Sequence, residues 1–134
     1  MKLTKLLLLA ISVVWAGQIA YAQAGPSSAR VRVVHGSTDA PAVDVYVNGG
    51  KVFENLPFGQ FTDYTALPPG TYNIDVNVAG TSTTVMSETY SLSAVDYTII
   101  AIGRVDNGTL HLRALGDDLF NPGAGNAKVR VLHA

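Results

Sequence analysis

The sequence predicts an all-β domain, built as an antiparallel β-sandwich of about seven or eight short strands and preceded by a signal-peptide helix. Three observations predict it. Apolar residues recur with a period of two from Ala29 onward. Turn residues such as Gly, Pro and Asn interrupt the apolar runs at short, regular intervals. After the N-terminal apolar run, no helical period of convincing length follows.

The N-terminus has the form of a secretory signal. Lys2 and Lys5 precede an apolar run over residues 6–15, and Ala20-Tyr21-Ala22 supplies the small-residue pattern that signal peptidase cleaves. The run is shorter than the roughly 20 apolar residues of a transmembrane helix. We therefore expect a signal peptide over 1–22, no membrane span after cleavage, and an extracytoplasmic location (periplasmic, cell surface or secreted). An uncleaved anchor is the alternative.

Composition limits what the remaining chain can do. Removing 22 of the 134 residues leaves 112, the size of one domain. Two of the nine basic residues lie in the signal, so the remaining chain has seven basic and ten acidic residues. Its net charge is therefore −3, and it contains no basic cluster. Nucleic acid is therefore not expected as a partner. Cysteine is absent, which excludes disulfides, thiol catalysis and a zinc-thiolate site, and which favours a bacterial protein.

The first strands follow a short linker over 23–28. In the stretch 29–35, Val31 and His35 share one face while Arg32 points the other way. A loop over 36–42 leads to a strand over 43–47, in which valines alternate with Asp44 and Tyr46. Asn48-Gly49-Gly50 then predicts a hairpin turn, because Asn and Gly tolerate the positive φ that such turns require.

The remaining strands lie between turns rich in Pro, Gly and Asn. Pro68-Pro69-Gly70 precedes the clearest strand, and Asp106-Asn107-Gly108 forms a hairpin turn before the last. Residues 97–102 are apolar on both faces, which indicates a central strand. Further strands are predicted over 51–54, 71–78, 85–92, 97–102 and 110–114. This pattern is typical of an immunoglobulin-like or transthyretin-like sandwich.

A repeat ends the chain. The sequence ARVRVVHG at 29–36 recurs as AKVRVLHA at 127–134, with only conservative substitutions. We therefore expect one β-sandwich repeat unit over 29–119, a linker over 120–126, and the first strand of a second, truncated repeat over 127–134. The chain is then a fragment of a longer tandem array. Alternatively, the terminal strand replaces the first strand of a neighbouring molecule by donor-strand exchange, giving self-association.

Residues 30–49, RVRVVHGSTDAPAVDVYVNG, closely resemble the opening signature of a bacterial family called domain of unknown function 4397. The segments LPFG at 56–59 and LPPGTY at 67–72 look like the middle of that family. Thr38 stands where the family often has proline. The resemblance implies an extracytoplasmic β-sandwich, often in tandem copies, without an established activity and without a catalytic residue to transfer.

One loop gathers candidate site residues. His35, Asp39 and Asp44 fall within ten positions and could hold a metal ion. Calcium needs six to eight oxygens, however, and zinc needs more imidazole than one histidine offers. The structural alternative is that Asp39 bonds its own turn and that His35 lies at the edge of the core. Tyr46 could face outward and stack on a sugar or contact a protein, or it could close the core.

Two other constellations are weaker. Ser37 stands between His35 and Asp39, but spacings of two along a strand do not build a catalytic triad. Asp117-Asp118 predicts a solvated turn, with a calcium site between tandem units as the alternative.

We therefore expect no catalytic residue, no metal and no cofactor. The expected function is a non-catalytic binding or scaffolding module at the cell envelope, with a protein or a carbohydrate as partner. A structural subunit assembling through 127–134 is the alternative, and a metal-dependent hydrolase using His35 and Asp39 is a distant one.

Overall fold

The computed structural model describes residues 27–133, so the expected signal peptide and most of the 23–28 linker lie outside it. The all-β prediction is confirmed within this range. The same residues contain no helix long and apolar enough to cross a membrane. The eight strands are β1 (Ala29–His35), β2 (Val43–Val47), β3 (Gly50–Leu56), β4 (Thr65–Leu67), β5 (Gly70–Val78), β6 (Thr84–Leu92), β7 (Asp96–Ile102) and β8 (His111–Asp117).

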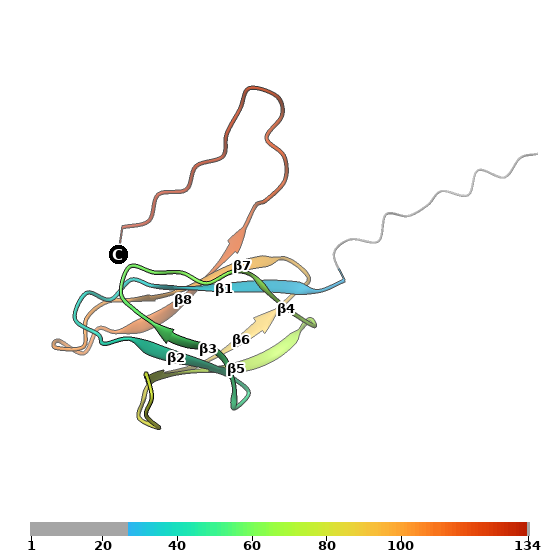
Figure 1. Cartoon of the computed structure of the whole chain (residues 1–134). Coiled ribbons are helices and arrows are strands. Elements are labelled where there is room, and N and C mark those ends of the chain that lie inside the picture. The colour runs from blue at the N-terminus through green and yellow to red at the C-terminus, as the bar shows by residue number, and fades with distance from the viewer. Residues whose placement is uncertain (1–26, 134) are drawn as a thin grey trace, which may run out of the picture.

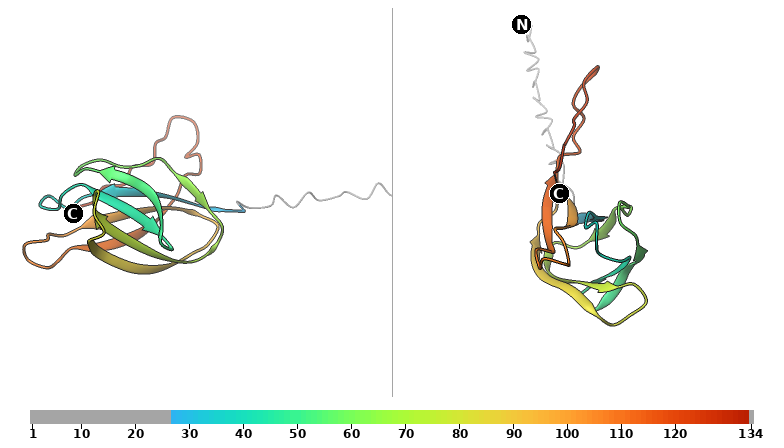
Figure 2. Two further views of the ribbon diagram at one scale, coloured as in Figure 1. Left: turned by 60° about the horizontal axis from the view of Figure 1, so that its bottom comes forward. Right: turned by 90° about the vertical axis from the view of Figure 1, so that its left-hand side faces the viewer.

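The strands form two four-stranded sheets that face each other (Figure 1). Sheet A has the order β4-β1-β7-β8, and sheet B has the order β3-β2-β5-β6. Every pairing between neighbouring strands is antiparallel except that of β1 with β7, which run in the same direction. Figure 2 shows the two layers from the side. The fold is therefore a β-sandwich, as the sequence predicts.

Alternate residues of both sheets meet in one core. Val31 and Val33 of β1 are buried, as the period of two predicts, and β7 and β2 contribute Ile99 and Val45. A space of about 10 Å³ between the sheets, lined by Val31, Val45 and Ile99 among others, is no larger than the space needed for one water molecule. Close packing around this space therefore leaves no room for a ligand in it.

Strand β7 is central, as predicted from its apolar faces. It lies between β1 and β8, and Ile100 on its outer face is buried although it points away from the core. Strand β4 was not predicted, because its three residues show no measurable alternation. It pairs only with β1, at the edge of sheet A.

Strand β3 continues beyond the predicted 51–54 because of a β-bulge. Val43 pairs with Leu56 and Val45 pairs with Phe53, so an extra residue of β3 lies between these pairs. Asn55 has a φ of 50°, a left-handed conformation that asparagine tolerates better than most residues. The bulge turns the backbone N–H of Asn55 toward β2, where it donates a hydrogen bond to Asp44.

The end of the chain leaves the sandwich and returns to it. Residues after β8 project away from the end of sheet A, turn back near Gly123 and run back toward the sheet (Figure 1). Residues 127–133, which we call the terminal segment, form no strand here. Whether this segment is the first strand of a further unit, as the repeat suggests, stays a prediction.

Candidate functional site

His35 lies at the end of β1 and is almost fully buried. Its Nε2 atom is 2.9 Å from the carbonyl oxygen of Pro41, so Nε2 carries the proton and donates it. The edge of the ring contacts Phe58, with ring centroids 6.2 Å apart and planes at 82°. The imidazole therefore holds the loop between β1 and β2 in place.

Asp39 links its own loop to a second one. Its carboxylate accepts hydrogen bonds from the backbone N–H groups of Val105 (3.0 Å) and Asp106 (2.9 Å), in the connection between β7 and β8. Ser37 Oγ adds a third, at 3.1 Å. These donors, with the two backbone groups first, lower the pKa of Asp39 to about 2. The bond from Ser37 lies within the loop of Asp39, in line with the expectation that Asp39 bonds its own turn, whereas the sequence did not predict the link to the β7–β8 connection.

The Asp44 side chain is buried and does not lie on an open strand face. It accepts hydrogen bonds from Lys51 Nζ (2.8 Å), from the bulged Asn55 N–H (2.8 Å) and from Gly80 N–H (3.1 Å). Lys51 contributes most to lowering the pKa of Asp44 to about 2, and the two backbone donors add to it. Because β3, the bulge and the β5–β6 turn surround it, this carboxylate is a structural anchor.

Tyr46 is half-buried beside this ion pair. The Lys51 ammonium lies 5.7 Å from the centroid of the Tyr46 ring, so one face of the ring is already occupied by a cation. Lys51 thus brings Asp44 and Tyr46 together, while His35 and Asp39 each have separate partners.

The positions of these side chains do not favour metal binding or catalysis. Within residues 27–133, no group of three or more His, Asp and Glu side chains is placed to hold a metal ion. Ser37 is fully buried and donates to Asp39. The Ser37, His35 and Asp39 side chains therefore do not form the relay of a hydrolase.

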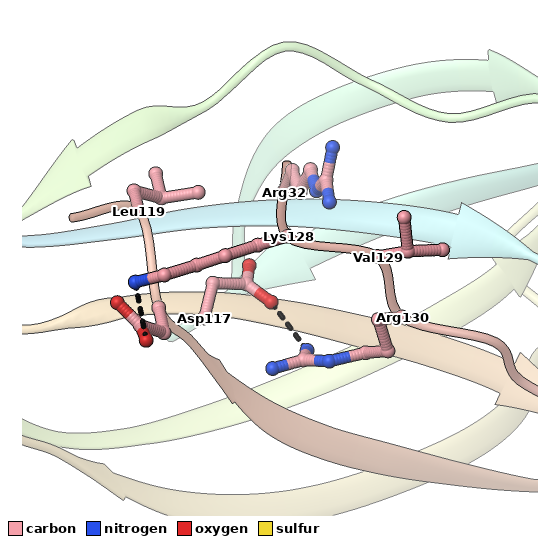
Figure 3. A pocket seen from close by; sticks show the side chains of 7 residues that line it. Arg32, Asp117, Leu119, Lys128, Val129 and Arg130 are labelled. Carbon is pink, nitrogen blue, oxygen red and sulfur yellow. Dashed lines mark hydrogen bonds and ion pairs between the residues drawn. The ribbon is translucent and has the colours of Figure 1, made fainter. Parts of the chain in front are cut away.

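A second charged site was not predicted as such. Asp117 is the last residue of β8, and its side chain is only 5% exposed. The prediction that it lies in a solvated turn is therefore wrong. Its Oδ2 atom accepts hydrogen bonds from Tyr64 OH (2.7 Å) and Thr98 Oγ1 (2.5 Å). Its Oδ1 atom accepts one from Arg130 of the terminal segment, at 2.6 Å (Figure 3).

Two further bonds hold the terminal segment here. Arg130 Nη2 donates to the carbonyl of Gly116 at 2.6 Å, and Lys128 Nζ lies 2.7 Å from Asp118. Lys128 is the main cause that lowers the pKa of Asp118. These side chains line an open recess of about 600 Å³. Figure 3 shows the recess from close by. The paired acids thus face basic side chains where the sequence suggested calcium.

Beyond this recess the terminal segment crosses an apolar strip on the outer face of sheet A. Val34, Ile100, Ile102 and Leu115 form the strip. Together with Arg113, and with Val131, Leu132 and His133 of the terminal segment, they line a recess of about 320 Å³. A signal for this site was present in the sequence. Lys128, Arg130 and Leu132 occupy the positions of Arg30, Arg32 and Val34, the outward residues of the repeated strand.

These features define a β-sandwich domain whose notable charged site joins the domain to its own terminal segment. The family model described as Domain of unknown function (DUF4397) matches residues 29–134. The chain therefore belongs to this family, as the resemblance implied. No curated protein matches the chain.

Proposed function

We propose that this protein is a non-catalytic extracytoplasmic module that works in series with further units of the same kind, as a spacer or scaffold. One observation carries the proposal. The terminal segment repeats β1 position by position, yet Val129 and Val131 are 83% and 87% exposed where their counterparts Val31 and Val33 are buried. Residues suited to a core, left in water, are ready to enter the core of a following unit.

The candidate site residues support a structural role. The Asp39 and Asp44 carboxylates accept three hydrogen bonds each, and Ser37 is buried. A catalytic or metal-binding group must reach its ligand, and these groups already hold loops together. The expected signal peptide supports an extracytoplasmic location.

A unit of the same kind is a better partner than a carbohydrate. Stacking on a sugar requires an open aromatic face, whereas the Tyr46 ring lies under Lys51 and is half-buried. The terminal segment, in contrast, matches strand β1 of the same fold in sequence.

The experiment is to build a two-unit chain, in which residues 36–119 follow His133. Gly36 then replaces Ala134, because a Cβ at position 36 would come within 3.0 Å of the Ala101 carbonyl. We expect the terminal segment to become the first strand of a folded second unit. An NMR spectrum in which the second copy of 36–119 stays unstructured would contradict the proposal.

A matched substitution sharpens this test. Val131→Asp would bury a charge in the second unit and should unfold that unit alone. In the single-unit chain the same change should leave the melting temperature unaltered, because Val131 is exposed there. Equal effects in both chains would show that Val131 does not enter a second core.

Donor-strand exchange is the second candidate, because the same exposed valines could enter a neighbouring molecule. Against it, β1 already occupies its slot and pairs with β7 over six residues. Light scattering tests it: oligomers that disappear when residues 127–134 are deleted would favour exchange over a series of units. A monomer before and after deletion would exclude it.

A further inference from the structure

The terminal segment does not lie on the domain at random. The side chains of Lys128 and Arg130 are 40% and 43% exposed, and Leu132 is 51% exposed. Val129 and Val131 between them are more than 80% exposed, although Val131 touches the rim of the apolar strip. Lys128, Arg130 and Leu132 are therefore more covered than Val129 and Val131, although Val129 lines the charged recess and Val131 and His133 line the space beside the apolar strip.

This alternation matches the two faces of the repeated strand. In β1, the counterparts of Val129 and Val131 enter the core, whereas the counterparts of Lys128, Arg130 and Leu132 point out of sheet A. The segment thus contacts the first unit with the face that would be the outside of a second unit. Its core-forming valines remain more than 80% exposed, so they are available to that second unit.

Asp117 supplies an independent argument. A carboxylate buried to this degree needs a cation, because an unpaired buried charge is costly. Within the described residues, the ion pair of Asp117 is with Arg130, while Tyr64 and Thr98 use its other oxygen. The terminal segment thus supplies the ion-pair partner of Asp117, and Arg130 also helps to cover that carboxylate.

The apolar strip continues this surface. On the outer face of sheet A, β1 pairs Val34 with Ile100 of β7, while Leu115 of β8 lies one row nearer to Asp117. The terminal segment begins beside Asp118 and Asp117 and ends beside Val34 and Ile100. It therefore runs in the same direction as β1 and β7. A charged end and an apolar end together fix its position along the sheet.

We propose that the outer face of sheet A is the docking surface for the next β-sandwich unit of the same kind, which enters through the outward face of its own first strand. The proposal rests on the proposed function, because the terminal segment must be that first strand. Asp117 and Asp118 fix the register by binding the two basic residues. The apolar strip then meets the corresponding outer face of the second unit, so consecutive units hold a fixed orientation.

The first test uses residues 23–134 without any added unit. Heteronuclear ¹⁵N NOE values of residues 128–132 should be close to those of β8 in the unchanged chain. Arg130→Gln should lower them to the values of a free chain end, while Arg104→Gln, in the β7–β8 loop, should leave them unchanged. Values typical of a free end in the unchanged chain would overturn the docking surface.

The second test uses the two-unit chain and measures residual dipolar couplings. Both units should share one alignment tensor, and Arg130→Gln should give each unit its own tensor while both remain folded. Two folded units with independent tensors in the unchanged chain would overturn the docking surface and leave the proposed function standing. An unfolded second unit would contradict the proposed function itself.

Discussion

The ammonium of Lys51 lies 2.8 Å from the carboxylate of Asp44, inside a shell that the β3 bulge and the β5–β6 turn complete. Asp44 joins strands β2 and β3 to the turn after β5 through three bonds. In a chain without cysteine, such polar links hold loops together in place of disulfides. Asp44 and Asp39 have this role at two places in the fold.

Replacing Asp44 by Asn should destabilise the fold, because the buried site loses its charge while Lys51 and two backbone donors remain. Glu54→Gln is the matched control, since Glu54 also contacts Lys51, at 3.3 Å, but is exposed. We expect thermal unfolding to show a clear loss of melting temperature for Asp44→Asn and almost none for the control. Equal effects would mean that burial of the pair does not matter.

Stability should also decrease in acid. The pKa values of Asp39 and Asp44 are about 2 in the folded protein, below their ordinary value near 4. Protons therefore bind the unfolded chain more tightly. The stabilisation is complete above about pH 4 and is lost as the pH falls toward about 2. Urea unfolding between pH 2 and pH 6 should show this slope, and Asp44→Asn should flatten it. An unchanged slope in that variant would contradict the assignment.

Gly103 should tolerate no side chain. Its φ is +89°, and an added Cβ would overlap the carbonyl of Thr109 in the β7–β8 connection. Gly108 has a φ of +69° but open space around it, so Gly108→Ala should cost only about 1–2 kcal/mol for the left-handed backbone. Urea unfolding should show a larger loss for Gly103→Ala, and similar losses would show that the loop can rearrange.

Metal ions should not stabilise the domain. Among the residues that the structure describes, none form an acidic or imidazole cluster suited to an ion. A ligand that binds the folded state at 100 times its dissociation constant adds about 2.7 kcal/mol. We therefore expect millimolar Ca²⁺ or Zn²⁺ to leave the melting temperature unchanged. A saturable increase that disappears in Asp39→Asn would restore the metal hypothesis.

The strands were predictable where alternation is long, because burial on one face imposes a period of two. Strand β5 begins at Gly70, the last residue of the predicted turn, and ends at Val78, as its pattern indicates. Strand β4 has too few residues to show any period. The surroundings of Asp44 depend on one bulged residue, Asn55, which leaves no mark in a hydrophobic pattern.

The candidate site was less predictable, because its contacts join residues far apart in sequence. Asp39 binds backbone groups 66 and 67 residues away, and a pattern within one loop cannot show them. The repeat did identify the equivalent positions of β1 and the terminal segment. It could not show that Arg130 and Lys128 bind Asp117 and Asp118.

Calorimetry of the two-unit chain tests most directly whether the terminal segment serves a second unit. The enthalpy of unfolding scales with the number of residues that fold. We predict about twice the enthalpy of the single-unit chain, with the excess removed by Val131→Asp. An enthalpy equal to that of the single unit would contradict the account.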